Sequence, residues 1–109
     1  MAEVLQRVEA HLGQPVRVHD DVDLGPDTSG LWIHAAADAP NLIYLAAMPA
    51  ERRLYVLGHE IGHMVLGHGS SAARSHYDSP EERDAELFAT HMVERMRRPR
   101  LGPASLALR

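Results

Sequence analysis

The pattern His-Glu-x-x-His, formed by His59, Glu60 and His63, limits what this 109-residue chain can fold into more than any other stretch. On a helix, the two histidines lie one turn apart and point the same way, so both imidazoles can bind one Zn²⁺. Glu60 then lies beside the metal as a candidate general base. Because the chain has 8 histidines, such a pattern also arises by chance, and the flanking sequence has to support the metal interpretation.

The first half of the chain predicts one short helix and three strands. Apolar residues at helical spacing indicate a helix at residues 2–12, and Gly13 follows as a stop. Alternating or β-prone residues indicate strands at residues 15–19, 29–35 and 41–46. The second and third strands are close enough in sequence to form a hairpin, so we expect a small, mostly antiparallel sheet.

The second half predicts two helices. Pro49 opens the first, which carries His-Glu-x-x-His beside an apolar stripe and ends at Gly67 and Gly69. Ser79 caps the second helix, Pro80 follows at its first position, and Pro99 ends it. The expected fold is therefore α+β, with a single domain over residues 1–98 and a loose C-terminal tail over residues 99–109.

Two glycines, Gly58 and Gly62, lie inside the first of these helices and share one face. Each costs a helix about 1 kcal/mol relative to alanine. A helix gains from such glycines where another segment approaches closely, so we expect a segment, such as a strand or a substrate backbone, close to this face beside the metal.

A catalytic zinc site needs a third protein ligand and an open position for water. Measured around the second helix from Ala85, Glu82 lies at about +60° and Glu81 at about −40°, both within the apolar arc. Buried carboxylates are costly unless they are paired or bind metal, so both glutamates are candidate ligands. Glu82 has an ordinary alternative role, because it completes a capping box with Ser79.

Other polar residues between or near these helices have weaker patterns. His76 and Tyr77 lie in the loop before the second helix, from which either can donate a hydrogen bond to a developing oxyanion. His68 lies five residues after His63 and therefore on a different face, so we interpret it as a helix cap or a solvated residue.

Composition excludes several classes of protein. The chain has no cysteine, so a metal site must use histidine and carboxylate ligands. It has a net charge of −4 and no lysine, which disfavours direct binding to nucleic acid. The N-terminus has no signal-peptide pattern and no run is long enough to span a membrane, so we expect a cytoplasmic protein.

Two motifs together resemble those of the ImmA/IrrE-type metallopeptidases. Residues 51–63 are similar to the active-site helix of that family, and residues 82–89 are similar to its second motif, Glu-x-x-Ala-(Asn/Asp)-x-Phe-Ala. The resemblance implies a minimal zincin-like, gluzincin-like fold, with the edge strand of the sheet at residues 41–46. It also implies site residues, namely His59, His63 and Glu82 as zinc ligands, Glu60 as the catalytic glutamate, and Glu86 as a residue that supports a ligand.

The resemblance further implies a zinc-dependent endopeptidase that acts on a protein partner, such as a helix-turn-helix transcriptional repressor. The alternative is a zinc-stabilised binding module that sequesters a repressor or toxin without cutting it. Glu60 favours the peptidase, because a purely structural zinc site does not need a glutamate next to its first ligand.

Overall fold

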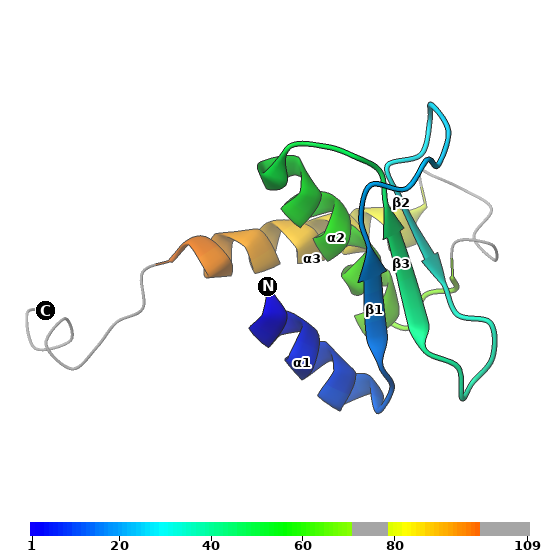
Figure 1. Cartoon of the computed structure of the whole chain (residues 1–109). Coiled ribbons are helices and arrows are strands. Elements are labelled where there is room, and N and C mark those ends of the chain that lie inside the picture. Colours follow the sequence, from blue (N-terminus) through cyan, green and yellow to red (C-terminus); the bar gives the residue numbers. More distant parts are fainter. Residues whose placement is uncertain (71–78, 99–109) are drawn as a thin grey trace, which may run out of the picture.

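A computed structural model describes residues 1–70 and 79–98 as an α+β fold, which confirms the predicted class (Figure 1). Three helices and three strands follow one another in the predicted order. They are α1 (Ala2–Leu12), β1 (Val16–His19), β2 (Gly30–Ile33), β3 (Asn41–Leu45), α2 (Ala50–Val65) and α3 (Pro80–Arg97). Within the described ranges, no helix is both long enough and apolar enough to cross a membrane.

The sheet has the order β1-β3-β2, so β3 is its central strand. The predicted hairpin is confirmed, because β2 pairs antiparallel with β3. The prediction that residues 41–46 form an edge strand is wrong. Strand β1 pairs in parallel with the other side of β3, which makes the sheet mixed. The edge strands are therefore β1 and β2. A parallel pair needs a long connection, and here the chain passes through β2 before it returns to β3.

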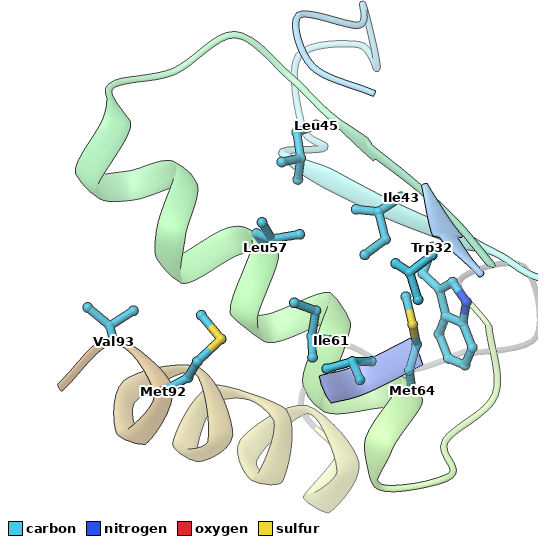
Figure 2. Close-up of a cluster of buried hydrophobic side chains, with 10 residues drawn as sticks. Trp32, Ile43, Leu45, Leu57, Ile61, Met64, Met92 and Val93 are labelled. Carbon is cyan, nitrogen blue, oxygen red and sulfur yellow. The ribbon is translucent and has the colours of Figure 1, made fainter. Parts of the chain in front are cut away.

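Helix α2 lies between the sheet and α3, with its apolar stripe toward both (Figures 1 and 2). Ile43 and Leu45 on β3 are fully buried and face Leu57 and Ile61 on α2. On the other side of α2, α3 contributes Met92 and Val93. Because α2 is covered from two sides, its position is set by the whole core, and so is the position of any polar residue that it carries.

The two helix boundaries nearest the predicted site follow the sequence signals. At the start of α3, the Ser79 hydroxyl accepts a hydrogen bond from the Glu82 N–H at 3.2 Å, with Pro80 at the first helical position. At the end of α2, Gly67 has a left-handed conformation with φ of 76°. The Gly67 N–H donates to Met64 O at 3.2 Å and the His68 N–H to His63 O at 2.8 Å, which is a Schellman turn.

Candidate metal centre

Helix α2 presents His59 and His63 on one face, as the spacing predicts. Their Nε2 atoms lie 3.1 Å apart, and their rings meet edge to face. The two imidazoles differ in environment, because the His59 side chain is 25% exposed and that of His63 is 0% exposed. The two Nε2 atoms therefore point at one place. This place lies at the boundary between the buried core and an open cleft.

Glu82 from α3 completes this cluster. One carboxylate oxygen, Oε2, lies 2.7 Å from His59 Nε2 and 2.9 Å from His63 Nε2. The cap of α3 uses the Glu82 main chain, so the Glu82 side chain can reach the histidines while its N–H bonds to Ser79. Glu81 is exposed, and the prediction that it also faces the core is wrong. It is wrong because α2 covers only the side of α3 that carries Glu82 and Ala85.

The interior glycines of α2 set the distance between the helices that carry the ligands. A Cβ on Gly62 would lie 3.1 Å from the Ala85 Cα and O atoms, and one on Gly58 would lie 3.1 Å from the Ala89 Cα. Such contacts are tighter than side chains normally make. The predicted close approach is thus confirmed, but the approaching segment is helix α3 rather than a strand or a substrate.

Glu60 is 4% exposed and lies next to the same cluster. Together with His59 and Glu82, it lines a cleft of about 700 Å³ between α2, α3 and the start of β2. A Cβ on Gly30 would lie 3.5 Å from the Glu60 Cγ, so β2 passes close beside this glutamate. A carboxylate beside the cluster and a cleft open to solvent are the two features that a hydrolytic metal site needs beyond its ligands.

The electrostatics favour an ionised Glu82. Burial raises the pKa of its carboxyl, but the charges and hydrogen bonds of His63 and His59 lower the pKa by more, so the net shift is downward. Glu82 is therefore an anion at neutral pH, as a metal ligand has to be.

These three residues fit a zinc ion. Two imidazole nitrogens and one carboxylate oxygen form a ligand set of catalytic zinc sites. Ligand atoms at about 2.0–2.2 Å from a tetrahedral ion lie roughly 3.3–3.5 Å from one another. The separations of 2.7, 2.9 and 3.1 Å in the cluster are about 0.2–0.8 Å smaller, and side-chain rotations that move the three ligand atoms apart supply this difference. Among the described residues, this is the cluster whose ligand atoms can share a metal.

The remaining predicted site residues have different outcomes. Glu86 is exposed and lines the cleft near the cluster. His76 and Tyr77 lie outside the described residues, so their assignment as oxyanion donors stays a prediction, and the tail over residues 99–109 lies outside them too.

Sequence reasoning missed His68, whose Nδ1 lies 2.9 Å from the Nδ1 of His63. The interpretation of His68 as a cap agrees with its main chain, whose N–H donates to His63 O, but its ring is half-buried and not simply solvated. The signal was Gly67, because the residue after a left-handed glycine folds back toward the third residue from the helix end. In α2 that third residue is His63.

Comparison with known families agrees with this geometry. The family model described as Peptidase_M78, IrrE N-terminal-like domain, matches residues 16–94. The matched range contains all three strands, α2 and most of α3, and thus every residue of the cluster. Neither the curated proteins nor the solved structures that were compared with the chain include a significant match.

Proposed function

The chain belongs to the Peptidase_M78 family of IrrE N-terminal-like domains, and on this premise we propose that it is a zinc-dependent endopeptidase. The observation that supports this proposal best is the arrangement of His59, His63 and Glu82 around one point, with the buried carboxylate of Glu60 at the same cleft. Family membership alone suggests a metallopeptidase, and the cluster indicates which residues would do the work.

Each residue has a defined task in this proposal. His59, His63 and Glu82 hold the ion through Nε2, Nε2 and Oε2. A bound Zn²⁺ supplies Lewis-acid chemistry, since it polarises a carbonyl and brings the pKa of water to about 7. The Glu60 carboxylate accepts a proton from the attacking water and later passes it to the leaving amine. The low exposure of Glu60 keeps bulk water from competing for that proton.

An extended segment of substrate fits best along β2. We expected strand addition at residues 41–46, but β3 is paired on both sides and cannot accept another strand. Strand β2 pairs with β3 alone among the described strands, and its first residues, Gly30 and Leu31, line the cleft. Substrate main chain added to β2 would pass beside Glu60 and the ligand cluster.

The class of substrate that we propose is a protein partner, such as a helix-turn-helix transcriptional repressor in the cytoplasm. The cleft supports a protein substrate, because it is open at the surface and has a strand edge along it. The proposed role is regulation of transcription through the repressor, without direct binding of this chain to nucleic acid.

The test of the enzyme proposal is the variant Glu60→Gln, assayed against the products of neighbouring genes with and without a chelator. We expect the variant to bind zinc like the wild-type chain and to lose cleavage by about 10²–10⁴-fold, the usual contribution of a general base. Glu94→Gln, at an exposed position of α3 that does not line the cleft, is the matched control and is expected to retain most of the activity. Cleavage by Glu60→Gln at the wild-type rate would show that Glu60 is not the base.

The alternative is a zinc-stabilised module that binds its partner without cutting it. The complete burial of His63 favours this reading to some extent, since structural metal sites are closed to solvent. The two functions differ in one result. A module would retain a stable complex with an intact partner in the presence of zinc, whereas a peptidase would convert the partner to fragments.

A further inference from the structure

His68 contacts the metal cluster and lies outside residues 51–63 and 82–89, the two stretches that resemble the family motifs. It lies in the turn after α2, half-buried, and its ring meets that of His63 at an angle of 63° with 5.1 Å between the centroids. The two Nδ1 atoms lie 2.9 Å apart, which is a hydrogen-bond distance. His63 thus has its Nε2 directed at the cluster and its Nδ1 directed at His68.

The chemistry of two imidazoles decides which of them donates. A neutral imidazole has one N–H and one lone pair, so a hydrogen bond between two Nδ1 atoms needs a single proton between them. To bind an ion through Nε2, His63 must have its lone pair there and its proton on Nδ1. His63 therefore donates from Nδ1, and the lone pair of His68 Nδ1 accepts.

Burial explains why His63 needs this partner more than His59 does. The side chain of His63 is 0% exposed, and a buried N–H without an acceptor would cost about 1–3 kcal/mol. The side chain of His59 is 25% exposed, so water can reach it. An acceptor from the protein is thus most valuable at His63.

The backbone brings the acceptor to this place. Gly67 takes the left-handed conformation that ends α2, and the His68 N–H donates to His63 O at 2.8 Å. His63 and His68 are consequently joined twice, once through the main chain and once through the rings. This double link fixes the plane of the His63 ring relative to the helix.

We propose that His68 is a positioning residue for the metal site, which accepts the Nδ1–H of His63 and keeps its Nε2 lone pair aimed at the ion. This inference rests on the metal site of the proposed function but does not require peptidase activity. Removal of a hydrogen-bond partner behind a metal-binding histidine typically costs 10–100-fold in metal affinity. We expect a loss of that size when His68 is unable to accept.

The experiment measures zinc affinity of the full chain by competition with a chromophoric chelator. His68→Phe retains a planar ring without an acceptor, and His68→Asn places an amide oxygen where Nδ1 was. We expect His68→Phe to bind zinc about 10–100-fold more weakly and His68→Asn to recover most of that loss. His91→Phe and His91→Asn, at an exposed position on α3, are the matched controls and are expected to bind like wild type.

A second readout does not depend on the folding of any variant. In the zinc-loaded wild-type chain, the imidazole Nδ1–H of His63 should give a proton NMR signal that exchanges slowly with water. The role of His68 would be overturned if His68→Phe bound zinc as tightly as wild type, or if His68→Phe and His68→Asn were weakened equally. Fast exchange of the His63 Nδ1 proton would overturn it too. Failure of the wild-type chain itself to bind zinc would instead refute the metal site on which both proposals rest.

Discussion

The two halves of helix α2 are held in place by different kinds of interaction. In the first half, charged side chains reach neighbouring segments at the surface, as Arg53 does to Asp20 and Glu51 to Arg97. In the second half, the residues from Gly58 to Met64 are buried apart from the partly exposed His59. The half with the exposed ion pairs has no proposed site residue, whereas the buried half has three, two of which contact Glu82.

This difference shows what positions the metal cluster. Exposed ion pairs contribute about 0–1 kcal/mol each, because water screens them. Contacts such as that between Gly62 and Ala85, where an added methyl would lie 3.1 Å from the backbone, define the separation of two helices to a few tenths of an ångström. The geometry of the site is therefore set by backbone packing between α2 and α3, and substitutions in the two halves should have unequal effects.

The largest expected difference concerns the stability that zinc provides. At free zinc 1,000-fold above its dissociation constant, a bound ion adds about 4 kcal/mol to the free energy of unfolding. We expect a chelator to lower the melting temperature of the wild-type chain and of Arg53→Ala, but not that of His63→Ala. Calorimetry with and without chelator measures this. A melting temperature of His63→Ala that falls as much as that of wild type would refute the assigned ligand.

The next effect concerns Gly62→Ala. Its Cβ would press on the backbone of Ala85 at 3.1 Å, a form of overpacking that costs about 1–3 kcal/mol, while better helix propensity returns up to about 1 kcal/mol. We expect a net loss of stability, together with weaker zinc binding, because Glu82 lies one turn before Ala85.

Gly13→Ala is the control for Gly62→Ala. Gly13 has φ of 69° and open space around its Cβ position, so the substitution strains the backbone far from the site. It should destabilise the chain to a similar extent and leave zinc affinity unchanged. Weakened zinc binding in both variants would mean that stability in general, rather than the spacing of α2 and α3, controls the site.

A smaller effect on stability is expected for Asp20→Asn. Asp20 lies in the loop after β1 and pairs with Arg53, in the first half of α2. The hydrogen bond from Arg53 lowers the pKa of Asp20; burial opposes this slightly and the charge of Arg53 adds to it. Since the folded pKa is the lower one, the stabilisation is complete above about pH 4 and is lost as the pH falls through the folded pKa.

The size of that effect follows from exposure. Asp20 is 44% exposed, so its pair with Arg53 contributes at most about 1 kcal/mol. Denaturant unfolding with chelator present should show a larger difference between wild type and Asp20→Asn at pH 7 than at pH 3. An equal difference at both values would indicate a role other than the ion pair.

The smallest effect is expected for Glu51→Gln, which removes the partner of Arg97. Arg97 also lies over the Tyr55 ring, with its guanidinium carbon 5.8 Å from the ring centroid, so the side chain retains one contact. We expect no measurable change in zinc affinity and little change in melting temperature. A clear loss of zinc binding would show that the surface contacts of the first half do position the cluster.

The features that the sequence predicted correctly depend on local chemistry. The histidine pair follows from helical spacing, and the start of α3 follows from Ser79 and Pro80, each within one turn of the chain. The hairpin of β2 and β3 is likewise a short-range feature.

The errors concern relations between segments. A central strand and an edge strand can both show the alternating burial that β3 has. The sequence of β3 therefore did not reveal that a strand pairs with it on each side. Helical angles placed both Glu81 and Glu82 on the core-facing side of α3, so both were candidate metal ligands. The periodicity of α3 does not show from which direction α2 approaches. Gly58 and Gly62 predicted that another segment approaches α2 closely, but they did not show that this segment is α3.

The zinc content of Glu82→Gln, compared with that of Glu81→Gln, tests the assignment of the metal site most directly. The two residues are neighbours in the first turn of α3, yet only Glu82 reaches the histidines, while Glu81 is exposed. We expect stoichiometric zinc in the wild-type chain and in Glu81→Gln, and little or none in Glu82→Gln after dialysis against a weak chelator. Stoichiometric zinc in Glu82→Gln, held as tightly as in wild type, would contradict the metal site described here.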